Sequence, residues 1–119
     1  MADNKTANAP QEEATTKENT GVVTLTLTKP LDYNGRVYTE IIMDLENLTG
    51  KDSMEVEAEL MQRKKQAVIM GALNNDYIMG SASKATARAK CPLGTDAFLA
   101  LSLKDFNRVK NAVQNFLLK

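Results

Sequence analysis

The sequence has no histidine and no tryptophan, and Cys91 is the single cysteine among its 119 residues. Histidine is the usual general base near neutral pH and the commonest metal ligand, so its absence removes the most frequent routes to hydrolysis and metal binding. A lone cysteine forms neither an internal disulfide nor a CxxC metal site. Because small secreted domains usually carry disulfides, the cytosol is the expected compartment.

The chain also has no excess of charge of either sign, because its 15 Lys and Arg residues balance 15 Asp and Glu residues. Nucleic-acid-binding domains normally carry a basic excess, and membrane-surface anchors carry polybasic segments. No apolar run approaches the length of a membrane-spanning helix, and the first 20 residues lack the apolar core of a signal peptide. We therefore expect neither nucleic acid nor a membrane as a partner.

Sequence patterns of known catalytic sites are also missing. The phosphate-loop and EF-hand patterns are absent. Ser83 and Lys84 are a conceivable nucleophile and base, but neighbours in a helical sequence do not face each other. Only Lys90 stands close enough to Cys91 in sequence to lower the pKa of its thiol, so a buried or incidental cysteine is the better interpretation. We expect no enzyme activity, no catalytic residues, no metal and no cofactor, which leaves binding as the function class.

Residues 1–20 differ in composition from the rest of the chain. They are rich in Asn, Thr, Ala, Glu and Lys, with no aromatic residue and no apolar periodicity. This composition predicts a disordered tail, with a docking arm that orders on a partner as the alternative. Residues 21–119 are predicted to form a single α+β domain.

The domain is predicted to begin with a β-hairpin over residues 22–43. Apolar residues alternate with threonine in Val22–Thr28, and a second segment rich in β-branched residues follows at Arg36–Met43. Between them lies Asn34-Gly35, a pair typical of the type I′ turn, which needs positive φ at both central positions.

A two-residue loop at this turn predicts the pairing of the two strands. Leu27 would lie opposite Ile42, and Lys29 opposite Glu40. Pro30 cannot donate a hydrogen bond to a sheet, so the first strand is expected to be an edge strand or to contain a bulge at that point.

Helical periodicity and capping motifs dominate the remainder of the chain. Thr49 with Asp52, and Ser102 with Asp105, have the spacing of capping boxes. The predicted helices span about 50–72, 76–90, 95–101 and 103–118. The expected fold is therefore a disordered N-terminal tail, an N-terminal β-hairpin and a small bundle of three to four helices.

Two apolar stripes on these helices are the candidate partner-binding surfaces. The first comprises Met54, Met61 and Val68, and the second comprises Phe106, Val109, Val113 and Phe116. A helix that lies in a groove uses a stripe of this spacing, and methionine suits an adaptable surface. The alternative is that both stripes pack against the hairpin as core.

The order of these motifs resembles one protein family. The segment KPLDYNGRVYTEIIM, followed by LTGKD, is similar to the start of phage tail assembly chaperones of the Mu and P2 type, in their short form. The matching positions are Tyr33, Asn34, Gly35, Tyr38, Thr49, Gly50 and Asp52. The end of the chain matches as well, at Asp105-Phe106 and Phe116-Leu117. The resemblance covers residues 22–118 and does not include the tail.

The resemblance implies a non-enzymatic chaperone that works in the host bacterial cytoplasm and is absent from the mature virion. Such proteins bind the tape measure protein, keep it soluble and aid assembly of the tail tube around it. Further partners that the resemblance implies are the tail-tube protein and a frameshifted long form of the chain itself.

Two other functions remain open. A structural tail or head–tail connector component would assemble into a ring, whereas a chaperone would stay monomeric or associate weakly. A small DNA-binding regulator would need a basic recognition helix, and the last predicted helix carries only Lys104, Arg108 and Lys110 beside its apolar stripe.

Overall fold

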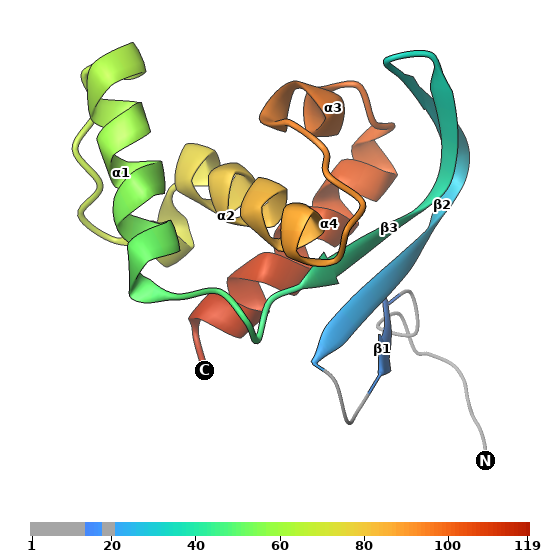
Figure 1. Cartoon of the computed structure of the whole chain (residues 1–119), viewed down its shortest axis with the longest axis horizontal. Coiled ribbons are helices and arrows are strands. Elements are labelled where there is room, and N and C mark those ends of the chain that lie inside the picture. Colours follow the sequence, from blue (N-terminus) through green and yellow to red (C-terminus); the bar gives the residue numbers. More distant parts are fainter. Residues whose placement is uncertain (1–13, 18–20) are drawn as a thin grey trace.

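The computed structural model describes residues 14–17 and 21–119, and its architecture is α+β (Figure 1). The elements are β1 (Ala14–Lys17), β2 (Val22–Tyr33), β3 (Arg36–Asp44), α1 (Gly50–Lys64), the 3-10 helix η2 (Gly71–Leu73), α2 (Asn75–Arg88), α3 (Thr95–Leu99) and α4 (Leu103–Leu117). The predicted hairpin followed by helices is confirmed.

The sheet has one strand more than the predicted hairpin. Its order is β1-β2-β3, and both pairs are antiparallel. The added strand, β1, falls within the segment for which the sequence predicts a tail, and there it pairs Ala14 with Leu25 and Lys17 with Val22. The sequence ATTK gives no strand signal because it lacks apolar alternation. The rest of that segment, 1–13 and 18–20, lies outside the described residues.

The turn of the hairpin forms as predicted, but the pairing beyond it does not. Asn34 and Gly35 have φ values of 52° and 78°, and Tyr33 pairs with Arg36. A bulge then interrupts β2 between Thr26 and Leu31.

The bulge moves the pairing by three residues. Glu40 lies opposite Thr26 instead of Lys29, and Ile42 lies opposite Thr24 rather than Leu27, so the predicted register is wrong there. The physical reason is burial, because the observed register places Leu25 opposite Ile41 and both side chains lie in the core. The predicted irregularity at Pro30 is confirmed.

A buried carboxylate holds this bulge in place. Asp105, on the first turn of α4, is 1% exposed. Its Oδ2 accepts hydrogen bonds from the Thr28 amide at 2.9 Å and the Thr28 hydroxyl at 3.0 Å, and the Lys29 amide donates to it at 3.4 Å. Bulge residues lose their partners in the sheet ladder, so the carboxylate replaces the acceptor that β3 cannot supply.

Arg108 completes the interaction from the next turn of α4. Its guanidinium donates to Asp105 Oδ1 at 2.9 Å and to the carbonyl oxygen of Thr26 at 2.7 Å. Burial by itself raises the pKa of Asp105, but the hydrogen bonds from Thr28 outweigh it and hold the pKa below its ordinary value. Only one of the two hydrogen bonds of the predicted capping box forms: the Asp105 amide donates to Ser102 Oγ at 3.3 Å. The Asp105 carboxylate binds β2 instead of the Ser102 amide.

Helix α1 ends eight residues before the predicted boundary at residue 72. Lys65 adopts a left-handed conformation with φ of 52°, and its amide donates to the carbonyl oxygens of Leu60 and Met61. This geometry terminates a helix. Helices α2, α3 and α4 end within two residues of the predicted limits.

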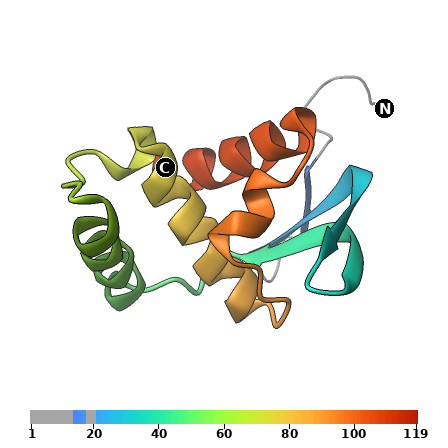
Figure 2. The ribbon, with the colours of Figure 1, turned by 90° about the horizontal axis from the view of Figure 1, so that it is seen from above.

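Three layers build the molecule, and they are the sheet, the pair α2 and α4, and α1 (Figure 2). Helix α2 packs against β3, α4 packs against β2, and α1 contacts α2. Small side chains at Ala82 and Ala85 let α2 approach the sheet closely, and both are fully buried. The largest fully buried apolar side chains of the core are Phe98, Leu25, Ile41, Met43, Ile78, Leu93, Val109 and Val113.

We predict that Asp105→Asn lowers the free energy of unfolding by about 3 kcal/mol, because it removes the negative charge from a buried ion pair and weakens the hydrogen bonds that hold the bulge. Urea titration at neutral pH measures the change. Glu57→Gln, at an exposed position of α1, is the matched control and should shift the midpoint little. Equal effects of the two variants would show that the Asp105 carboxylate stabilises the fold no more than an exposed carboxylate does.

The lowered pKa of Asp105 makes the free energy of unfolding depend on pH. Since the pKa of Asp105 is lower in the folded state than the unfolded value of about 3.9, the folded state binds fewer protons. Its contribution is complete above that unfolded value and is lost as the pH falls through the folded pKa. Urea midpoints measured from neutral to acidic pH should fall more steeply for the wild type than for Asp105→Asn. Parallel profiles would contradict this assignment.

Candidate partner-binding groove

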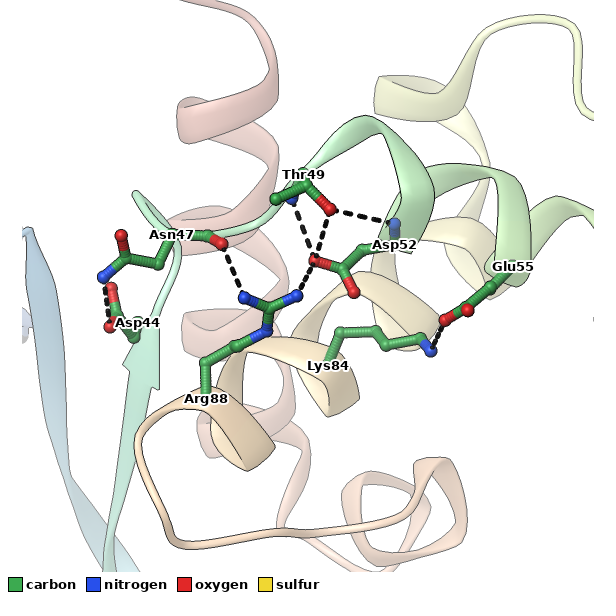
Figure 3. Close-up of polar contacts among 7 residues, drawn as sticks. All are labelled: Asp44, Asn47, Thr49, Asp52, Glu55, Lys84 and Arg88. Atoms are coloured by element: carbon green, nitrogen blue, oxygen red, sulfur yellow. Dashed lines mark hydrogen bonds and ion pairs between the residues drawn. The ribbon is translucent and has the colours of Figure 1, made fainter.

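The start of α1 is tied to the end of α2 through Asp52. The predicted capping box is present: the Asp52 amide donates to Thr49 Oγ1 at 3.3 Å, and the Thr49 amide donates to Asp52 Oδ2 at 2.9 Å. Arg88, in the last turn of α2, donates to the same Oδ2 at 2.7 Å and to the carbonyl oxygen of Asn47 at 3.1 Å (Figure 3). One carboxylate therefore caps α1 and binds it to α2.

The charge state of Asp52 follows from these contacts. Burial raises the pKa of its carboxyl, but the Thr49 amide and the Arg88 guanidinium lower it more strongly, so the pKa lies below its ordinary value. One turn further along, Lys84 pairs with Glu55 and joins the same two helices (Figure 3).

A second set of polar contacts holds the other end of α1. Lys64 donates to Asp76 Oδ1 at 3.1 Å, and Gln66 donates to Asp76 Oδ2 at 3.2 Å. The hydrogen bond from Lys64 is the main reason why the pKa of Asp76 lies below its ordinary value. Helix α1 is thus fixed to α2 at both of its ends.

Between these two ends, α1 rests directly on a glycine of α2. A Cβ atom built on Gly80 would lie 2.6 Å from Val56 Cγ1, closer than nonbonded carbon atoms approach. Only glycine therefore permits this spacing between the two helices.

A groove opens where α1, α2 and α3 meet. It encloses about 180 Å³, and its apolar lining comes from Val56 and Leu60 of α1, Met79 of α2 and Leu99 of α3. An adjoining hollow of about 430 Å³ shares Val56, Gly80 and other lining residues with it. In Figure 1, α1 and α3 stand on either side of α2, which provides the floor.

The charges around the groove are largely neutralised within the chain. Arg63 pairs with Glu59 at 2.8 Å on α1, and the pairs from Lys64 and Lys84 to the acidic residues already described flank them. On the opposite wall, the Tyr33 hydroxyl donates to Asp96 Oδ1 at 2.9 Å. An apolar floor with a compensated rim favours an apolar or amphipathic ligand over an anion.

The hydrogen bond from Tyr33 also fixes the wall that α3 forms. It joins the tip of the hairpin to the first turn of α3 and raises the pKa of the tyrosine hydroxyl. The position of Leu99 at the end of α3 therefore depends on where the hairpin tip lies.

The first predicted stripe divides between surface and packing. Met54 and Met61 are 72% and 48% exposed, and their helical spacing from Val56 and Leu60 places them on the side of α1 that faces away from the groove. Val68, which follows α1, is half-buried against the cluster around Leu60 and Tyr77.

The second predicted stripe belongs to the core. Val109 and Val113 are fully buried, and Phe106 and Phe116 are half-buried against the same cluster. These side chains are occupied by packing within the chain, as the alternative interpretation of the stripe requires. The groove is the better candidate because it has an accessible apolar wall in Leu99, which is 74% exposed, above the buried Val56, Leu60 and Met79.

The groove residues were not among the candidates from the sequence. Val56 and Leu60 stand four apart and carried a helical signal, but the methionine spacing on the other face of α1 was equally regular. Met79 and Leu99 come from two other helices, and only the tertiary fold brings them together.

Within residues 14–17 and 21–119, no group of three or more acidic, cysteine or histidine side chains could hold a metal ion. None of the helices in these ranges has the length and apolar character needed to cross a bilayer. The chain matches no protein-family model, and searches of curated proteins and of solved structures found no similar protein.

We predict that Gly80→Ala destabilises the protein by about 1 kcal/mol. Alanine favours a helix by up to about 1 kcal/mol, but overlap with the stiff Val56 side chain costs about 1–3 kcal/mol. Urea denaturation measures the net effect. In a Val56→Ala background the overlap disappears, so the same substitution should be neutral or stabilising. An equal cost in both backgrounds would contradict the close approach of α1 and α2.

Proposed function

We propose that this chain is a non-enzymatic phage tail assembly chaperone that binds helical segments of a tape measure protein in the groove between α1, α2 and α3. It would act in the cytoplasm of the host bacterium, aid polymerisation of the tail tube and leave before the virion is complete. The observation that carries the proposal is an open apolar groove whose rim charges are already paired within the chain.

The groove suits the apolar face of an amphipathic helix. Val56, Leu60 and Met79 line the groove but are at most 9% exposed, so Leu99 supplies most of its accessible apolar surface. Covering apolar surface stabilises a complex by about 25 cal/mol per Å². Leu99 is 74% exposed and gains most from being covered. A tape measure protein that is long, helical and partly apolar has such faces to offer.

Paired rim charges influence which partner sequences are accepted. Lys64, Arg63 and Lys84 already have acidic partners, so a bound helix does not need a fixed pattern of charges. Methionine adapts to different shapes, and Met79 lies on the groove floor. Both features support binding of many different segments along one long chain.

The exposed methionines of α1 offer a second apolar surface to the same partner. Met54 and Met61 face away from the groove, so one helix cannot contact both surfaces. A long partner with several apolar segments could occupy each of them with a different segment.

The motif positions behind the family resemblance have structural roles in this chain. Asn34 and Gly35 form the turn, and Thr49 and Asp52 cap α1. These structural roles support a fold in common with the tail assembly chaperones. None of these residues contacts a partner in the proposal, which rests on the groove.

We predict that Leu99→Glu reduces capture of the tape measure protein by about tenfold or more, because a carboxylate in the groove must lose water when the partner binds. The measurement is co-expression with the long, helical protein of the same operon, followed by pull-down of the soluble fraction. Leu103→Glu is the matched control, since Leu103 is also 74% exposed but does not line the groove.

The double variant Met54→Glu with Met61→Glu tests the second surface in the same assay, and a partial loss of capture is expected. If the long protein is insoluble with or without this chain, and the chain alone forms a stable ring by light scattering, a structural tail or connector component replaces the chaperone proposal. Equal capture by the wild type and by Leu99→Glu would show that the groove does not bind the tape measure protein.

A further inference from the structure

Strand β3 forms one of the two edges of the sheet, and among the described residues no strand pairs with its outer side. The order β1-β2-β3 leaves β3 paired on one side only. Its last residues contribute Ile41 and Met43 to the core, whereas the segment Arg36–Glu40 is exposed except at Tyr38. Val37 is 66% exposed, so this edge presents an apolar side chain to solvent.

The backbone of this segment is suited to accept another strand. In a two-residue hairpin, Tyr33 and Arg36 exchange both of their backbone hydrogen bonds, so the alternation of the ladder directs the amide and carbonyl of Val37 away from β2. In the part of the chain that the structure describes, neither Val37 nor Thr39 has a backbone hydrogen bond outside the sheet.

Apart from the charged side chains of Arg36 and Glu40, β3 has few of the features that usually protect an edge strand. Proteins block exposed edges with proline, lysine or a bulge. In this sheet, Pro30, Lys29 and the bulge all lie on β2, beyond the residues 22–25 that pair with β1, so they do not protect the outer edge of β3. The sequence of β3, RVYTEIIMD, contains neither lysine nor proline.

Two opposite charges on β3 are spaced for pairing between copies. Arg36 and Glu40 alternate with Tyr38 on one face of the strand, and four residues of strand separate them by about 13 Å, too far for an ion pair within the chain. Neither charge takes part in an ion pair within residues 14–17 and 21–119. The Arg36 guanidinium lies over the Tyr38 ring, 5.2 Å from its centroid.

We propose that the free edge of β3 pairs antiparallel with β3 of a second copy of this chain, about a two-fold axis at Tyr38. This register places Arg36 of each copy opposite Glu40 of the other and Val37 opposite Thr39. A shift by two residues in either direction would place Arg36 opposite Tyr38 or Ile42, so only the central register satisfies both charges. The two-fold symmetry then forms the same ion pair twice.

The association is weak and depends on concentration, because a few residue pairs bury much less area than a stable dimer requires. It does not involve the groove residues. The proposal therefore goes beyond the chaperone function and can fail or stand independently of it.

Charge exchange between copies provides the test, with sedimentation velocity over a concentration series up to the millimolar range. Arg36→Glu alone and Glu40→Arg alone each place like charges opposite one another twice, so the dimer dissociation constant should rise by roughly tenfold. An equimolar mixture of the two variants restores both opposite-charge pairs in the heterodimer, and its dissociation constant should return towards the wild-type value.

Thermal unfolding of each variant separates loss of pairing from loss of fold. Glu57→Arg, a charge reversal at an exposed position of α1, is the control and should leave the dimer dissociation constant unchanged. A wild-type chain that stays monomeric throughout the series would overturn the proposal. Association of the single variants at wild-type strength, or a mixture no stronger than its components, would overturn it as well.

Discussion

The interaction on which the rest of the structure depends is the hydrogen bonding of the Asp105 carboxylate to the bulge in β2. Four residues of β2, from 27 to 30, lie opposite a single residue of β3, so the sheet ladder cannot satisfy all of their backbone polar groups. Asp105 accepts from Thr28 and Lys29, and Arg108 bridges the carboxylate to the carbonyl of Thr26. A buried ion pair that also satisfies backbone groups fixes one arrangement of helix and sheet, since every misplacement leaves a polar atom without a partner.

The consequences of this contact extend to the groove. The bulge sets the register that buries Leu25 against Ile41, and it separates the core part of the hairpin from its tip. The tip then reaches α3 through the hydrogen bond from Tyr33 to Asp96, which positions the wall that carries Leu99. On the other side, polar contacts at both ends of α1 hold the opposite wall against Gly80. The groove is thus an open space between two independently fixed helices.

Motifs that act over a few neighbouring residues predicted most helices and strands. Contacts between residues far apart in the sequence could not be predicted. Asn34-Gly35 and the Thr49–Asp52 capping box act over a few residues, and both form as predicted. The predicted register is wrong because the extent of the bulge depends on distant contacts: Leu25 is buried opposite Ile41, and Asp105 accepts from Thr28, 77 residues away. The predicted end of α1 is wrong because Lys65 adopts a left-handed conformation, and lysine is not a residue type that predicts one. The candidate site differs from the predicted stripes because its exposed wall, Leu99, belongs to α3, and only the tertiary fold places Leu99 beside Val56 and Leu60 of α1.

The central claim is that the groove is the surface that meets a partner helix. Photo-crosslinking tests it most directly: a photoreactive amino acid replaces Leu99 in one sample and Leu103 in another, each co-expressed with the tape measure protein, and mass spectrometry identifies the crosslinked peptides. The account predicts crosslinks from position 99 to apolar faces of several helical segments of the partner, and few or none from position 103. Equal crosslinking from both positions, or crosslinks from position 103 alone, would contradict it.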